Sequence, residues 1–126
     1  YLNHAVGLIR KNFDVFANGL NKDKFYNDFK LEGNSSFCFP VITKSTQEDT
    51  FALRKYLESQ GVETRPIIAG NLYEHPFMDR VNQYRHDKNA KVIHQNGFYV
   101  GNNHAVNVGD VTWLVERLNA WEKGEQ

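Results

Sequence analysis

Residues 35–61 read SSFCFPVITKSTQEDTFALRKYLESQG and predict one strand followed directly by one helix. Residues 35–43 are rich in aromatic and β-branched types, and Phe37, Phe39 and Val41 alternate onto one face, which is typical of a strand. Pro40 has no backbone N–H to donate to a neighbouring strand. We therefore expect this strand at an edge of its sheet.

The helix that follows has a start signal, an apolar face and a stop signal. Ser45 is followed three residues later by Glu48, which is the spacing of a capping box. Gly61 ends the helical pattern because glycine readily adopts the left-handed conformation found after helices. The apolar face consists of Leu53, Tyr56 and Leu57.

The rest of the chain alternates between helical and strand-like segments. The first 20 residues have the apolar spacing of a helix, and Asn107 or Asp110 is suited to cap a final helix. Short strands and helices fill the middle of the chain. We predict a helix over 1–20, strands over 35–43, 62–68 and 98–100, and helices over 46–60, 76–84, 89–95 and 111–121.

This order predicts an α+β fold, in which a small, three-stranded, mostly antiparallel sheet is covered by helices mainly on one side. The chain has 126 residues, 15 Lys+Arg and 15 Asp+Glu, which argues against a surface dedicated to nucleic acid or an anionic membrane. It contains no apolar run of the ~18 residues that a transmembrane helix needs.

Few residues suggest catalytic chemistry. The single cysteine, Cys38, excludes an internal disulfide and is expected to be a small buried hydrophobic residue. The five histidines show no zinc-binding spacing, so we expect surface or hydrogen-bonding roles rather than a metal site. They are His4, His75, His86, His94 and His104.

Two loops have a composition suited to a ligand. Residues 65–71 begin with Arg65 and end with Asn71, and residues 101–104 include Asn102 and His104. A guanidinium beside glycine-opened backbone suits phosphate, and Asn and His side chains suit sugar hydroxyls. The alternative is that the Gly and Asn residues only form turns.

These loops carry a resemblance to a known family. GVETRPIIAGN (61–71), Pro76 and NGFYVGNNH (96–104) resemble the C-terminal domain of the DegT/DnrJ/StrS sugar-aminotransferase family, most closely its nucleotide-4-keto-6-deoxyhexose 3-dehydratase branch. The resemblance implies a dimeric, cytoplasmic, bacterial enzyme with the aspartate-aminotransferase fold (fold type I) that takes part in lipopolysaccharide dideoxysugar synthesis. It also implies that Arg65, Asn71, Asn102 and His104 line the cleft for a nucleotide-sugar.

The resemblance implies a division of labour within the whole enzyme. Pyridoxal 5′-phosphate or pyridoxamine 5′-phosphate would be held by a large N-terminal domain that precedes this chain, so no catalytic or cofactor-binding residue is expected here. Residues 1–20 would be a helix that enters from the large domain, with Phe13 or Phe16 exposed toward it. Residues 21–126 would be the small domain, inactive alone.

Three alternatives remain open from the sequence. One is a sugar-nucleotide aminotransferase of the same family, because the position that separates the two activities lies upstream of Tyr1. Another is a single-stranded RNA-binding module, with Phe98 and Tyr99 as a stacking platform on the last strand. The third is a structural domain whose loops bind nothing.

Overall fold

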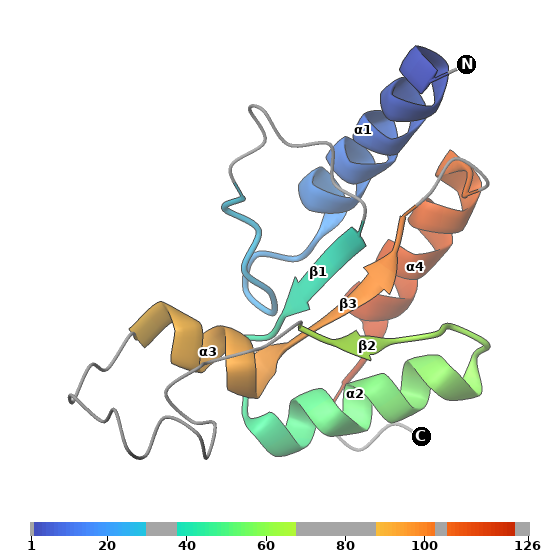
Figure 1. Ribbon diagram of the computed structural model, residues 1–126. Coiled ribbons are helices and arrows are strands. Elements are labelled where there is room, and N and C mark those ends of the chain that lie inside the picture. The colour runs from blue at the N-terminus through green and yellow to red at the C-terminus, as the bar shows by residue number, and fades with distance from the viewer. Residues whose placement is uncertain (1, 30–37, 68–87, 103–105, 123–126) are drawn as a thin grey trace.

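A three-stranded antiparallel sheet forms the centre of the fold, as the computed structural model shows for residues 2–29, 38–67, 88–102 and 106–122 (Figure 1). The strand order is β1-β3-β2, so the last strand in the sequence is the central one. The elements are α1 (Leu2–Gly19), β1 (Cys38–Ile42), α2 (Gln47–Ser59), β2 (Arg65–Pro66), α3 (Lys88–Asn96), β3 (Gly97–Gly101) and α4 (Val108–Ala120). The predicted α+β class is confirmed, whereas the predicted helix over 76–84 lies outside the described residues.

The strand register separates a buried face of the sheet from a more open one. Phe39 pairs with Val100 and Val41 pairs with Phe98, and these side chains belong to the core or pack against it. Helices α1 and α4 lie side by side against this face (Figure 1). As predicted from Pro40, β1 is an edge strand of the described sheet, with β3 as its neighbouring strand. Just past its end, an isolated antiparallel bridge joins Thr43 to Phe25.

The opposite face contains Pro40, Tyr99 and Arg65, which follow one another across the three strands. Pro40 and Tyr99 are half-buried and Arg65 is exposed. The prediction that helices cover the sheet mainly on one side is therefore in agreement with the described residues.

The expectation that Phe13 or Phe16 is exposed toward another domain was wrong. Both rings are buried within this chain, and they pack against Phe39 with centroid distances of 6.4 Å and 4.9 Å, respectively. The apolar face of α1 packs against the sheet within this chain. Helix α1 is thus part of the hydrophobic core of this fold.

Two details of the predicted helix and strand boundaries also changed. Thr46, rather than Ser45, caps α2, because its hydroxyl accepts a hydrogen bond from the Asp49 N–H at 3.1 Å. The strand predicted over 62–68 is shorter in the described residues, where β2 consists of Arg65–Pro66. Its predicted first residue belongs to the end of α2, because the Val62 N–H donates to the Leu57 carbonyl. Gly61 has a φ of 87°, which confirms its role as the helix stop.

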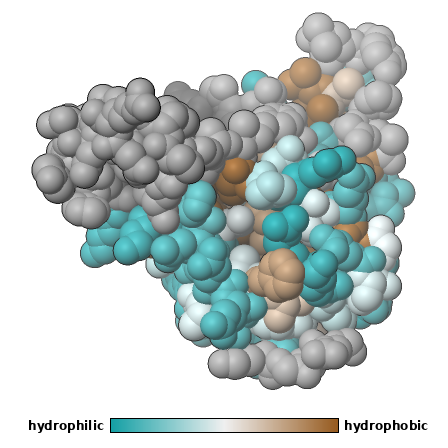
Figure 2. Space-filling model, turned by 60° about the horizontal axis from the view of Figure 1, so that its bottom comes forward, coloured by the Kyte–Doolittle hydropathy of each residue, from teal (hydrophilic) through white to brown (hydrophobic). Residues whose placement is uncertain are grey.

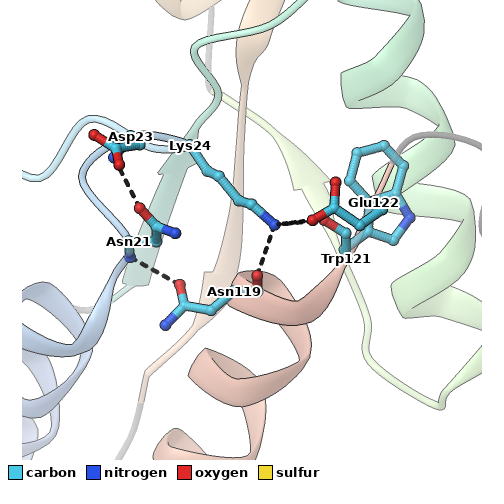
Figure 3. A network of polar contacts seen from close by, with 6 residues as sticks. All are labelled: Asn21, Asp23, Lys24, Asn119, Trp121 and Glu122. Atoms are coloured by element: carbon cyan, nitrogen blue, oxygen red, sulfur yellow. Dashed lines mark hydrogen bonds and ion pairs between the residues drawn. The ribbon is translucent and has the colours of Figure 1, made fainter.

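The C-terminal ends of α1 and α4 are tied together by a polar network (Figure 3). Asn119 accepts from the Asn21 N–H at 2.8 Å and donates to the Gly19 carbonyl at 2.8 Å. The ammonium of Lys24 donates to the Asn119 carbonyl at 2.8 Å and to the Trp121 carbonyl at 3.0 Å. These contacts satisfy carbonyl groups that a helix end leaves without partners. At the other end of α4, Asn107 and Asp110 together form the cap, as a capping box.

Candidate functional site

Arg65 is the predicted site residue that the structure leaves most accessible. It lies on β2 opposite Tyr99, and 63% of its side chain is exposed. Its guanidinium forms an ion pair with Glu63 on the same short segment. An exposed ion pair of this kind contributes little to stability, so the guanidinium can exchange Glu63 for a phosphate at small cost.

Asn102 is placed very differently. It follows β3 directly, its exposed fraction is only 3%, and its amide donates to the Ile9 carbonyl of α1 at 3.0 Å. Because side chains alternate along a strand, position 102 belongs to the buried face of the sheet and Tyr99, opposite Arg65, to the other face. Arg65 and Asn102 therefore point to opposite sides of the sheet.

The two predicted loops also leave the sheet at opposite ends. Strands β2 and β3 are antiparallel, with Arg65 opposite Tyr99 and Pro66 opposite Phe98. Ile67, which follows Pro66, lies beside Gly97 at the beginning of β3, whereas Asn102 lies beyond its end. The sequence suggested one shared cleft because both loops follow strands, but the direction of each strand is not visible in the sequence. Asn71 and His104 lie outside the described residues.

A groove near the end of β3 was not predicted. It has a volume of about 440 Å³ and lies between the end of β3, the α2–β2 connection and the first turns of α4. Val62, Val100, Val106 and Trp113 are among its apolar lining residues, and Glu63 and Asp110 supply carboxylates. The charged side chains among its described lining residues are both acidic, which disfavours the phosphates of a nucleotide.

Asn12 is a second residue that the sequence analysis missed. It is buried, with 1% exposed, and its amide donates to the Val106 carbonyl at 2.8 Å. A signal for it exists in the sequence, because Asn12 stands next to Phe13 on the apolar face that Ile9 and Phe16 define. A polar residue on the buried face of a helix indicates an internal hydrogen bond.

The structure does not provide the stacking platform that the RNA-binding alternative requires. Phe98 is fully buried in the core, where a base cannot stack on it, and only Tyr99 is on the more open face. The face that Figure 2 presents is mostly hydrophilic among the described residues, with small, separate apolar areas. No wide apolar patch is therefore visible on that face of the described residues.

The described residues offer little for catalysis or metal binding. Burial raises the pKa of the Cys38 thiol, which disfavours the thiolate and makes it a weak nucleophile. Cys38 is half-buried, not fully buried as expected. Within these residues, no group of three His, Cys, Asp or Glu side chains could hold a metal ion. None of the described helices is long and apolar enough to cross a membrane.

Comparisons with known proteins give the fold a functional context. No protein-family model matches the chain. A curated relative, GDP-4-keto-6-deoxy-D-mannose 3-dehydratase from Escherichia coli O55:H7 (strain CB9615 / EPEC), is 33% identical over 122 residues, which cover 90% of this chain and 30% of the relative. The chain is similar to part of this dehydratase. The resemblance to a nucleotide-4-keto-6-deoxyhexose 3-dehydratase that was inferred from the sequence is confirmed.

Solved structures of the same dehydratase share the fold. One, with a trapped PLP-glutamate geminal diamine, has a TM-score of 0.77 and 25% identity, and covers 93% of this chain and 32% of that chain. Another, a variant with bound GDP-perosamine, has a TM-score of 0.72 and 27% identity, and covers 90% of this chain and 31% of that chain. The PLP named in the first of these structures is the cofactor that the sequence resemblance implied. This chain spans about 30% of the length of the relatives that it matches.

Proposed function

We propose that this chain is the small C-terminal domain of a pyridoxal-phosphate-dependent enzyme that removes the 3-hydroxyl group of a nucleotide-linked 4-keto-6-deoxyhexose. The observation that carries the proposal is the agreement of sequence and fold over 90% of the chain with one dehydratase. We extend it to synthesis of lipopolysaccharide dideoxysugars by a cytoplasmic homodimer. Residues 1–20 are proposed to lead in from the large domain, and residues 21–126 to form the small one.

The described lysines differ in their surroundings from a lysine that binds a cofactor covalently. A lysine that binds pyridoxal phosphate covalently needs a free amine in a sheltered pocket. The described lysines are exposed apart from Lys24, whose ammonium is occupied by Asn119, Trp121 and Glu122. When bound, the cofactor supplies the electron sink for the reaction, and this domain would contribute only to binding and orienting the nucleotide-sugar.

The function is tested with the full-length protein that carries this chain. It is incubated with the cofactor, glutamate and GDP-4-keto-6-deoxymannose, and the product is analysed by NMR and mass spectrometry. We expect loss of the C3 hydroxyl group, and no turnover by the 126-residue chain alone. An aminated sugar would instead assign the aminotransferase alternative, and turnover by the isolated chain would contradict the proposed division of labour.

Arg65 is the proposed phosphate contact because it is charged and accessible. We expect Arg65→Ala to raise KM for the nucleotide-sugar by about tenfold or more, since a hydrogen bond to a charged group contributes roughly 1.5–3 kcal/mol. The matched control is Lys55→Ala, which removes an exposed positive charge from α2. Equal KM values for the two variants would remove Arg65 from the site. Asn71 and His104 remain predicted contacts from the sequence.

A further inference from the structure

The buried hydroxyl of Thr64 joins the start of β2 to α2. Its residue is 7% exposed, although Glu63 and Arg65 on either side of it are exposed. The Arg54 Nε–H donates to the Thr64 hydroxyl at 3.0 Å, and this hydroxyl donates in turn to the Glu58 carboxylate at 3.0 Å. Arg54 and Glu58 lie on one face of α2, because they are about one helical turn apart. We call Arg54, Glu58 and Thr64 the threonine anchor.

The threonine anchor acts where the strand itself is weakly held. Strand β2 consists of Arg65–Pro66, and Pro66 has no N–H to donate to β3. Few backbone hydrogen bonds can therefore hold this strand in place. The Thr64 side chain supplies a directional contact immediately before Arg65, because its hydroxyl accepts from a guanidinium and donates to a carboxylate.

The Arg54 guanidinium also contacts the central strand. Its central carbon lies 6.0 Å from the ring centroid of Phe98, which is fully buried on β3. Tyr99, the next residue along β3, is the one that lies opposite Arg65. The threonine anchor thus connects the residue before Arg65 both to α2 and to the part of β3 with which Arg65 pairs.

We propose that Thr64 is a positioning residue for the phosphate contact of Arg65. Thr64 is buried toward α2 and Arg65 is exposed, as expected for neighbours in an extended segment. The hydroxyl is used by α2 and sets the backbone from which the guanidinium extends. The ion pair between Arg65 and Glu63 joins residues of one short segment, so it does not fix this segment against the rest of the fold. The inference rests on the proposed function, in which Arg65 binds a phosphate of the nucleotide-sugar.

The experiment measures the kinetics of the full-length protein with GDP-4-keto-6-deoxymannose. Thr64→Val removes the hydroxyl and keeps the side-chain volume, and we expect it to raise KM by roughly fivefold with kcat nearly unchanged, because a misplaced guanidinium loses part of its contact. Thr64→Ser keeps the hydroxyl and is expected to restore the KM of the wild type. An unchanged KM in Thr64→Val would overturn the inference.

The valine variant is expected to fold. Arg54 is half-buried and Glu58 is exposed, so both side chains can form hydrogen bonds with water when the hydroxyl is lost. Thr64→Ala, which leaves room for a water molecule, is measured in parallel and is expected to raise KM in the same way.

Thr43→Val is the matched control. Thr43 is a buried threonine that follows β1, and its hydroxyl forms a hydrogen bond with the Thr50 hydroxyl of α2 at 2.7 Å. Both valine variants lose a hydrogen bond to α2, so urea unfolding is expected to show similar losses of stability, whereas KM rises in Thr64→Val alone. An equal rise of KM in the two variants would reveal a general structural effect and contradict the positioning role.

Combination with Arg65→Ala shows whether Thr64 acts through Arg65. If it does, Thr64→Val adds little to the rise of KM that Arg65→Ala alone produces, because the side chain that is positioned is already absent. Additive effects of the two substitutions would mean that Thr64 influences binding by another route, which overturns the inference.

Binding of GDP, measured by titration calorimetry in the same variants, separates this inference from the proposed function. If the wild-type protein does not dehydrate the sugar, the proposed function fails, whereas weaker and non-additive GDP binding by Thr64→Val and Arg65→Ala would support the positioning role. Dehydration with an unchanged KM in Arg65→Ala would keep the function and remove both residues from the site. A protein that neither dehydrates the sugar nor binds GDP would overturn both proposals.

Discussion

Replacement of Phe39 by alanine is expected to lower the free energy of unfolding by about 3–5 kcal/mol. The ring is 1% exposed and lies between the sheet and α1, where its centroid is 4.9 Å from that of Phe16 and 6.4 Å from that of Phe13. The substitution removes a large apolar side chain and these ring contacts, and the central position limits how far the neighbours can collapse into the cavity. Urea unfolding of the 126-residue chain, followed by circular dichroism, measures the change.

Phe51→Ala is the matched control for this prediction. Phe51 is on the outward face of α2 and is 59% exposed, with the Lys55 ammonium 5.2 Å from its ring centroid. Its loss removes little buried area, so we expect a change within about 0.5 kcal/mol. Similar losses for the two variants would mean that Phe39 does not lie at the centre of the core.

The patterns that are local in sequence predicted the fold well. The helical spacing of α1 and α4 and the alternation of Phe39 and Val41 each depend on residues a few positions apart, and the structure confirms them. The length of β2 was overestimated at its start, because the Val62 N–H donates to a carbonyl at the end of α2. Whether such an N–H bonds to the helix end or to a neighbouring strand depends on tertiary contacts, and the periodicity of the sequence does not show these contacts.

The candidate site was harder to predict because it depends on contacts between distant segments. Arg65 and Asn102 both follow or end strands in the sequence, but antiparallel pairing and side-chain alternation direct them to opposite faces. Neither the pairing nor the register can be read from one sequence. The polar residue Asn12 on an apolar helix face was the one local sign of the buried hydrogen bonds between α1 and the residues that follow β3.

Helix α1 is more firmly joined to the rest of the fold than a helix that only connects two domains. Its buried face packs on the sheet. Buried hydrogen bonds join Asn12 to the Val106 carbonyl and the Ile9 carbonyl to Asn102, and Asn119 ties α4 to the Gly19 carbonyl. The first connection involves the middle of α1 and residues that precede α4, and the second joins the C-terminal ends of both helices. We therefore expect α1 to move with the sheet as one body in any domain motion of a larger enzyme.

Gly97→Ala is expected to destabilise the chain by roughly 1–3 kcal/mol, because a side chain does not fit where α3 passes into β3. A Cβ atom at this position would collide with the Ile93 carbonyl oxygen and approach the Ile67 side chain to 3.2 Å. The carbonyl belongs to the backbone of α3, so it cannot turn aside as a flexible side chain could. Relief requires α3 or β3 to shift, and β3 is the central strand.

Gly101→Ala, at the other end of β3, tests whether this cost comes from the collision. No heavy atom of the described residues lies within 4 Å of a Cβ atom at Gly101, so alanine is accommodated there without strain. We expect a change within about 1 kcal/mol, because alanine also reduces the conformational entropy of the unfolded chain. Both free energies are measured by urea unfolding of the 126-residue chain. A Gly97→Ala chain as stable as Gly101→Ala would show that α3 and β3 are not joined as closely as the structure places them, and that the start of the central strand has freedom to move.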